Sequence, residues 1–169
     1  MSSLWSVWLL PNQKDRMRIK GLIEFYNSVY KTLFFDPHIT LYGRLDINPN
    51  LFFSFFNQIS LAYTSYQLST NSAAIGKVPW KTIYIGIEHD KNLFDLQKKI
   101  DKKLSSFRKY LFNPHLSLAY GNFIPKEKDI EVISLKKTIC FSTIALVSTP
   151  DQIEKWKIIK EYKLREKKV

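Results

Sequence analysis

Two short segments of this chain repeat one arrangement of residues that could do acid–base chemistry. Residues 36–43 read DPHITLYG, and residues 113–121 read NPHLSLAYG. In both, a proline precedes a histidine, an apolar residue and a hydroxyl residue follow, and the segment ends in Tyr-Gly. The chain has only three histidines. Placing two of them, His38 and His115, in the same pattern by chance is improbable at average composition.

A pair of histidines suits a reaction that needs both a base and an acid, because the usual pKa of imidazole lies close to neutrality. Opening a five-membered cyclic phosphate is such a reaction: a base activates water, and an acid protonates the departing ribose oxygen. Thr40 and Ser117 follow the two histidines and could donate hydrogen bonds to the phosphate oxygens that gain negative charge. The pattern therefore predicts His38 and His115 as catalytic residues, and Thr40 and Ser117 as phosphate-binding residues.

Alternation along a strand indicates which neighbours share a face with the histidines. His38, Thr40 and Tyr42 would lie on one face of their strand, so we expect Tyr42 to line the cleft. The same rule turns Tyr120 away from the face of the second histidine. Either that strand bulges near Gly121 or Tyr120 belongs to the core, and the sequence leaves both open.

Hydrophobic spacing and turn residues predict alternating strands and helices. We expect strands at residues 4–11, 36–43, 62–76, 80–88, 113–121, 138–149 and 156–164, and helices at 13–31, 48–59, 91–107 and 125–130. Each half then reads strand, helix, histidine strand, short helix, strand. The two histidines are separated by nearly the same distance along the chain as Trp5 and Trp80, which we take to begin equivalent strands. Near-equal offsets predict that the halves are structural copies.

These patterns predict one α+β domain over residues 1–169, with an internal repeat of roughly 4–76 and 80–165. Two lobes related by a pseudo-twofold axis would place two antiparallel sheets on either side of a central cleft, with the helices outside. The two histidine strands would then meet at that cleft.

The paired His-x-Thr/Ser segments resemble those of the two-histidine (2H) phosphoesterases, and most closely those of the cyclic phosphodiesterase branch. The first strand, SVWLLP at residues 6–11, and the second motif, PHLSLAY at residues 114–120, are both similar to that branch. The resemblance covers nearly the whole chain. It implies a bilobal 2H fold, no metal or other cofactor, and hydrolysis of a cyclic phosphodiester to a monoester. It also implies that Trp8 and Tyr120 lie beside the phosphate, although a strand tryptophan such as Trp8 can equally be core.

Composition indicates what kind of partner the protein binds and in which cellular compartment it works. The net charge of +11 favours an anionic partner, either a nucleic acid or a phosphorylated small molecule. A Lys-rich composition explains the charge equally well, because only five residues are Arg, the better reader of phosphate. The single cysteine, Cys140, cannot form an internal disulfide and fits a reducing cytoplasm. No apolar run is long enough to span a membrane, and the N-terminus lacks the basic region of a signal peptide.

The sequence therefore predicts a cytoplasmic, monomeric, metal-independent cyclic phosphodiesterase. Its substrate would be a small nucleoside 2′,3′-cyclic phosphate or ADP-ribose 1″,2″-cyclic phosphate. We expect His115 to take the proton from water and His38 to protonate the leaving oxygen. His89 belongs to neither segment and is expected in an exposed turn. No carboxylate or cysteine cluster has the spacing of a metal site.

Two other functions remain open. One is an RNA-directed relative, either a 2′-5′ ligase or an RNA-end phosphodiesterase, which the positive charge favours. Those relatives often carry an arginine after the second histidine strand, where this chain has Ala119-Tyr120-Gly121. The other is a non-enzymatic binder of RNA or nucleotides, a role that would not require two histidines and two hydroxyls in matching positions.

Overall fold

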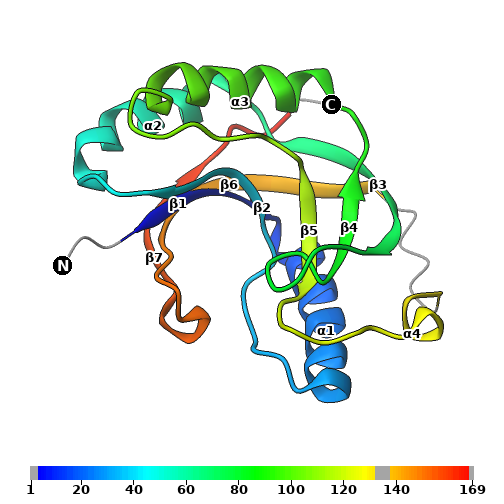
Figure 1. Cartoon of the computed structure of the whole chain (residues 1–169). Coiled ribbons are helices and arrows are strands. Elements are labelled where there is room, and N and C mark those ends of the chain that lie inside the picture. The colour runs from blue at the N-terminus through cyan, green and yellow to red at the C-terminus, as the bar shows by residue number, and fades with distance from the viewer. Residues whose placement is uncertain (1–3, 132–137, 168–169) are drawn as a thin grey trace.

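The computed structural model describes residues 4–131 and 138–167, which form a mixed α+β fold (Figure 1). The strands are β1 (Trp5–Pro11), β2 (Ile39–Leu45), β3 (Tyr66–Ile75), β4 (Ile83–Ile87), β5 (His115–Ala119), β6 (Thr138–Ser148) and β7 (Lys157–Lys163). The helices are α1 (Gln13–Tyr30), α2 (Phe53–Ala62), α3 (Lys91–Leu104) and α4 (Glu127–Glu131), with 3₁₀ turns η1 (Pro49–Phe52) and η2 (Ile153–Lys155). Each expected strand and helix is present, with bounds that differ by a few residues.

The start of the second half differs from the expectation. Trp80 was expected to begin a strand equivalent to that of Trp5, but it lies before β4. Residues 76–82 form the turn between β3 and β4, in which the Gly76 N–H donates to the Thr82 carbonyl at 3.1 Å. Trp80 is therefore 46% exposed on a hairpin turn, whereas Trp5 is fully buried in β1.

The strands form one curled antiparallel sheet in the order β2-β1-β6-β3-β4-β5, and β7 also pairs with β6 (Figure 1). The two antiparallel sheets expected from the sequence are its two parts, β2-β1-β6 with β7 and β4-β5, and they are continuous through β3. β3 pairs with β6 on one side and with β4 on the other, so it joins the two parts. Residues 66–69 of β3 pair with β6 and residues 70–75 pair with β4, so each part keeps its own ladder of backbone hydrogen bonds.

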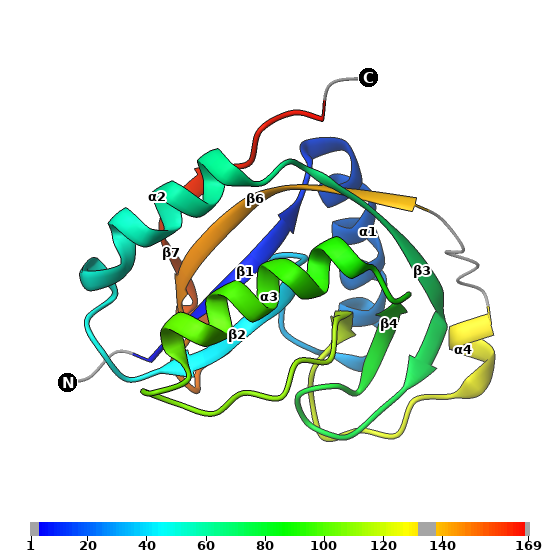
Figure 2. The ribbon, with the colours of Figure 1, turned by 90° about the horizontal axis from the view of Figure 1, so that it is seen from above.

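The two halves of the sequence exchange elements. β6 from the second half pairs with β1, and β3 from the first half pairs with β4. The histidine strands also contact helices of the opposite half, α1 against β5 and α3 against β2. α2 and α3 lie together over one side of the sheet, and α1 lies on the other side (Figures 1 and 2). The exchange runs in both directions, as a twofold relation between the halves requires.

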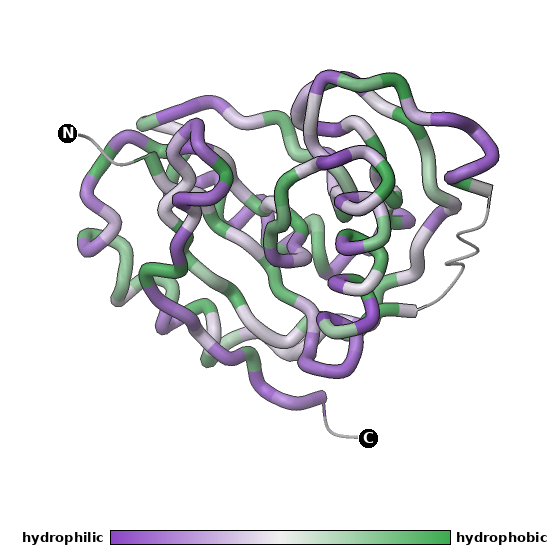
Figure 3. The backbone as a smooth tube through the Cα atoms, turned by 90° about the horizontal axis from the view of Figure 1, so that it is seen from below, coloured by the Kyte–Doolittle hydropathy of each residue, from purple (hydrophilic) through white to green (hydrophobic). Residues whose placement is uncertain are grey.

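Local sequence signals begin the two long helices. Asn12 caps α1 and Asp90 caps α3, because each side-chain oxygen accepts a backbone N–H three residues later. Purple and green segments alternate every few residues along the coiled parts of the chain, as amphipathic spacing requires (Figure 3). The apolar spacing placed Leu93, Leu96, Ile100, Leu104 and Phe107 on one stripe of α3. The first four are buried, whereas Phe107 lies beyond the end of the helix and is exposed. Within the described ranges, no helix is both long enough and apolar enough to cross a membrane.

Candidate active site

The two histidines are oriented by the same local hydrogen bond. His38 Nδ1 lies 2.6 Å from the backbone carbonyl oxygen of Asp36, and His115 Nδ1 lies 2.7 Å from that of Asn113. A carbonyl oxygen can only accept a hydrogen bond, so each Nδ1 carries a proton. Each Nε2 therefore keeps its lone pair when the ring is neutral. The intervening proline fixes φ in each motif, so the order Asp/Asn-Pro-His favours one ring orientation.

Both histidine strands contain a β-bulge at the same place in the motif. In β2, the register against β1 shifts by one residue at Leu41. In β5, the register against β4 shifts by one residue at Leu118. Each is the third residue after its histidine. An extra residue reverses the alternation of faces beyond it, so residues later in each motif point opposite to the simple prediction.

The bulges decide the positions of Tyr42 and Tyr120. We expected Tyr42 to line the cleft, and that was wrong: it is fully buried in the core, where its hydroxyl donates to the Arg108 carbonyl. For Tyr120, the sequence left two alternatives open: a bulge that turns it toward the cleft, or a place in the core. It lies just beyond β5 and lines the cavity that contains both histidines. Simple alternation fails at both tyrosines because the extra residue precedes each of them.

His38 and His115 line one cavity of about 200 Å³. Thr40 lies beside them, and five aromatic side chains form much of the wall. The lining residues are Trp8, His38, Thr40, Arg44, Trp80, Tyr110, His115, Tyr120, Thr149, Pro150 and Trp156. The structure therefore brings together five of the residues singled out in the sequence: both histidines, Thr40, Trp8 and Tyr120.

Ser117 occupies a deeper position than Thr40. Its side chain is buried and does not line the cavity, but it hydrogen-bonds Tyr120, which does. Burial raises the pKa of Tyr120 to about 12, although the hydrogen bond with Ser117 has the opposite effect on that pKa. The Tyr120 hydroxyl is therefore protonated at neutral pH and can donate a hydrogen bond. Ser117 is linked to the cavity through Tyr120, and its direct contact with a phosphate stays a prediction.

His38 is the more deeply buried of the two histidines, only 5% exposed. Its ring stacks on Trp8 with 3.5 Å between ring centroids and 6° between the planes. Burial lowers the pKa of His38 to about 4; the Asp36 carbonyl opposes this shift and repulsion from His115 adds to it. His38 is therefore neutral at pH 7 in the empty site. Trp8 is both buried and part of the cavity wall, so the two roles considered for it are combined.

His115 lies in a more accessible position. Burial lowers the pKa of His115, the Asn113 carbonyl opposes this shift, and the positive charge of Lys81 lowers the pKa further. The Lys81 amine lies 4.1 Å from the centre of the Tyr84 ring, and that ring packs almost perpendicular to His115. A bound phosphate would raise the pKa of both histidines, because a nearby negative charge favours imidazolium.

Helix α1 anchors the loop that carries His38. The Asp36 carboxylate lies 3.0 Å from Arg16 Nη2 and 2.9 Å from Lys20 Nζ. Burial raises the pKa of Asp36, but its hydrogen bonds and ion pairs with Lys20 and Arg16 hold that pKa below its usual value. The corresponding residue of the second motif is the uncharged Asn113. The two motifs thus have the same backbone geometry and different charges.

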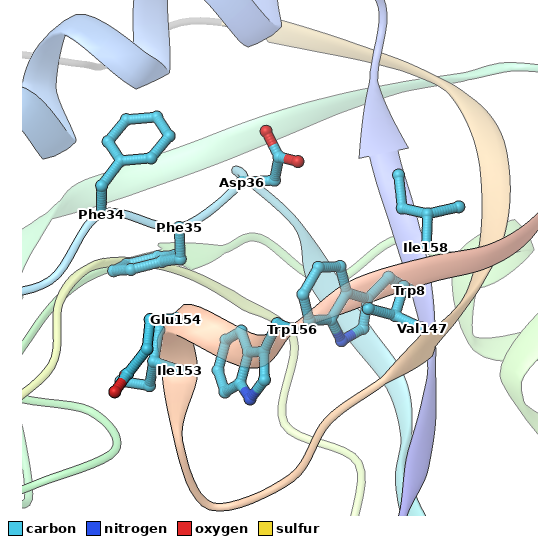
Figure 4. Close-up of a pocket in the computed structure, with 9 residues that line it drawn as sticks. All are labelled: Trp8, Phe34, Phe35, Asp36, Val147, Ile153, Glu154, Trp156 and Ile158. Carbon is cyan, nitrogen blue, oxygen red and sulfur yellow. The ribbon is translucent and has the colours of Figure 1, made fainter. Parts of the chain in front are cut away.

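A smaller pocket of about 160 Å³ adjoins the cavity at Trp8 and Trp156, which line both. Figure 4 shows the two indoles and Phe35 among the side chains around it. The Phe35 ring lies 6.4 Å from that of Trp156 and 4.2 Å from that of Tyr120. These ring contacts support the aromatic wall of the cavity from behind.

Several lining residues were missed in the sequence, and two of them had a local signal. Arg44 directly follows the first motif. A Cβ at Gly43 would lie 3.1 Å from the Tyr110 ring, so the motif glycine makes room for Tyr110. Trp80 and Trp156 come from distant turns and had no such signal. Thr149 and Pro150 follow β6 and reach the cavity only because β6 pairs with β1.

The third histidine lies outside the cavity. His89 is exposed between β4 and α3, with its ring 4.5 Å from that of Phe94, as expected for a turn residue. Among residues 4–131 and 138–167, no three His, Cys, Asp or Glu side chains gather as a potential metal site.

Comparison with known proteins agrees with this geometry. Residues 1–164 match the family described as cyclic phosphodiesterase-like protein. The chain belongs to this family. A relative named cyclic phosphodiesterase, from Arabidopsis thaliana, is 20% identical over 125 residues, which cover 74% of this chain and 69% of the relative.

Solved structures show the same fold at low sequence identity. E. coli LigT complexed with phosphate has a TM-score of 0.64 and 14% identity, over 97% of this chain and 98% of LigT. E. coli LigT complexed with 3′-AMP has a TM-score of 0.59 and 13% identity, over 97% and 99%. TT0787 of Thermus thermophilus has a TM-score of 0.62 and 12% identity, over 98% and 100%. The predicted 2H phosphoesterase fold is confirmed.

Proposed function

We propose that this protein hydrolyses a cyclic phosphodiester to a phosphomonoester without a metal ion. The substrate is a small nucleoside 2′,3′-cyclic phosphate or ADP-ribose 1″,2″-cyclic phosphate. The observation that carries the proposal is the meeting of His38 and His115 in one cavity, each with Nδ1 bonded to a backbone carbonyl. That arrangement leaves both Nε2 atoms for proton transfer. Membership of the cyclic phosphodiesterase-like family supports the same reaction class.

In the proposed reaction, water attacks the phosphorus while one Nε2 removes its proton. In a nucleoside 2′,3′-cyclic phosphate, the phosphorus–oxygen bond to the ribose 3′ oxygen breaks, and the other histidine gives its Nε2 proton to that oxygen. The product is a 2′-phosphate, and the two histidines have exchanged protonation states. Thr40 and the hydrogen-bonded Ser117–Tyr120 pair donate to the non-bridging oxygens, which gain negative charge in the transition state.

The electrostatic surroundings favour one division of labour. His38 is held neutral by burial, so it suits the base that takes the water proton. His115 is more accessible and would more readily become the imidazolium that protonates the leaving oxygen. This division is the reverse of the one expected from the sequence. It follows from burial, which the two matching motifs do not reveal.

The experiment uses four nucleoside 2′,3′-cyclic phosphates, ADP-ribose 1″,2″-cyclic phosphate and a cyclic-phosphate-ended RNA, all with excess EDTA. Phosphorus NMR identifies the product isomer. His38→Ala and His115→Ala should each lower turnover by roughly a hundredfold to ten-thousandfold. Zinc- or manganese-dependent turnover would refute the metal-free mechanism, and no turnover by folded protein would refute the hydrolase. RNA binding without turnover would identify the non-enzymatic binder.

An activated aryl phosphodiester separates the two histidine roles, because its leaving oxygen needs little protonation. Turnover of this substrate should be restored in His115→Ala and should stay low in His38→Ala. The opposite result would assign the base to His115.

The RNA-directed alternative is favoured by one observation, the net charge of +11. Faster turnover of the cyclic-phosphate-ended RNA than of every small substrate would establish it. We also propose that the protein works as a monomer in the cytoplasm, where its single cysteine stays reduced. Gel filtration and localisation of a tagged protein test both statements.

A further inference from the structure

A second cavity adjoins the catalytic one and has no place in the reaction described above. It measures about 340 Å³, and Trp80 and Tyr120 line both cavities. We call it the outer pocket and define it by Tyr30, Lys31, Thr32, Trp80, Tyr120 and Phe123. A molecule held at the histidines could therefore extend past Trp80 into the outer pocket without leaving the surface.

The walls of the outer pocket are aromatic. Tyr30 and Phe123 stack with 4.5 Å between ring centroids and 21° between planes. The Trp80 ring lies 6.0 Å from that of Tyr120 at a steep angle, and Trp80 is 46% exposed. An exposed tryptophan between two cavities offers a free ring face. Aromatic side chains with free faces bind nucleobases by stacking, largely without regard to the identity of the base.

Hydrogen bonds of the neighbouring residues hold the backbone turn that carries Trp80. The Gly121 N–H donates to the Pro79 carbonyl at 2.8 Å, and the Thr82 hydroxyl donates to the Gly121 carbonyl at 2.7 Å. Gly121 has a φ of 142°, in a region that favours glycine. The hairpin turn of Trp80 is thus fastened to the turn that follows Tyr120. With the backbone of the turn held, only the side-chain torsions of Trp80 have to be restricted on binding, which lowers the entropic cost of stacking.

The outer pocket also has polar groups suited to a nucleotide. Lys31 ends α1 in a left-handed conformation, with φ at 55°, and its side chain is exposed at the pocket. The Thr32 hydroxyl oxygen is buried and has no hydrogen-bond partner within the described part of the chain. The lysine can pair with a phosphate, and the threonine can bond a base or ribose edge.

We propose that the outer pocket binds a nucleobase that is not attached to the reacting ribose but is joined to it through one or more phosphates; we call it the second base. This inference rests on the proposed function and adds to it a binding site for a part of the substrate that lies beyond the reacting ribose. The second base stacks on Trp80, and Lys31 neutralises the linking phosphate. Two kinds of molecule have this chemistry: an RNA end with a cyclic phosphate, and a nucleoside diphosphate attached to a cyclic phosphate sugar.

The test compares kcat/KM for adenosine 2′,3′-cyclic phosphate, ApA ending in a 2′,3′-cyclic phosphate, and ADP-ribose 1″,2″-cyclic phosphate. At least one longer substrate should be preferred by about fivefold to about a hundredfold, through a lower KM. The preferred substrate identifies the source of the second base. Trp80→Leu and Lys31→Asn should each reduce this preference, and asparagine is chosen because it tolerates the left-handed backbone. Ile124→Ala, at a 91% exposed site outside the pocket, is the matched control and should keep it.

Equal kcat/KM values for the three substrates, or a preference that persists in both variants, would overturn the inference. Inertness of all three substrates would instead refute the proposed function. In that case, quenching of tryptophan fluorescence in His115→Ala by ApA and by AMP decides the outer pocket separately. Tighter binding of ApA, weakened by Trp80→Leu, would support the outer pocket, and equal binding would refute it.

Discussion

The burial of His38 should make the stability of the protein depend on pH in a way that one substitution removes. The folded-state pKa of His38 is about 4, and its ordinary value is 6.5. As the pH falls below 6.5, the unfolded chain binds a proton at this site and the folded chain does not. Protonation therefore favours unfolding. Between about pH 7 and about pH 5, His38 alone should remove about 2 kcal/mol from the free energy of unfolding.

His38→Asn isolates this contribution. The asparagine amide can occupy the place of Nδ1–H and donate to the Asp36 carbonyl, but it does not titrate. Urea unfolding at a series of pH values, followed by the fluorescence of the four tryptophans, gives the free energy of unfolding of both proteins. The difference between wild type and variant should change by about 2 kcal/mol across this interval, in favour of the variant at low pH. The depressed pKa of Asp36 also destabilises the fold in acid, but both proteins share that contribution unless the substitution changes the Asp36 pKa.

Parallel stability curves for wild type and His38→Asn would refute the reasoning, because His38 would then titrate alike in the folded and unfolded states. His89→Asn is the control, since it removes an exposed imidazole outside the cavity. That variant should follow the wild type. If His89→Asn also diverges in acid, the effect belongs to the loss of any histidine and not to the burial of His38.

Three further predictions concern catalysis. Thr40→Val and Ser117→Ala should slow turnover by up to roughly 2.7–4 kcal/mol if each loses an oxyanion donor; a loss of melting temperature without a kinetic effect would make the hydroxyls structural. Asp36→Asn should lower kcat by up to roughly a hundredfold by loosening the loop of His38, and should move the acid limb of the pH profile lower, because its carboxylate favours imidazolium; an unchanged profile would contradict this. Because the pKa values of both His38 and His115 are lowered, kcat/KM should peak on the acid side of pH 6.5, and a peak in the alkaline range would show that the depressed values do not govern catalysis.

The order of helices and strands along the chain was predictable because apolar spacing and turn residues are local sequence signals. Apolar spacing located helix α3, and the repeated Pro-His segments located β2 and β5. The sequence did not reveal that β3 connects the two sheets, since pairing of β3 with β6 depends on contacts between distant parts of the chain. The same limitation explains Trp80. A tryptophan beside alternating residues looks like a strand start, but the turn around it is closed by contacts that periodicity does not report.

Of the residues at the site, mainly those inside the two histidine motifs could be predicted from the sequence. Position within the motif placed both histidines and Thr40 at one cavity. It could not place Tyr42 and Tyr120, since a single extra residue in the strand reverses their faces. Nothing in the sequence connected Trp156 with the histidines, because only the folded sheet brings the residue before β7 to the cavity.

The two motifs are alike in backbone and unlike in surroundings, and this difference is what the reaction needs. A base and an acid must begin in different protonation states, which two identical sites would not favour. Stacking on Trp8 and deeper burial act on His38, whereas His115 has a more open position beside Lys81. Only the first motif has a charged residue, Asp36, tied to α1. In the proposed reaction, two similar motifs thus supply the two proton carriers, and the residues that differ around them assign their separate roles.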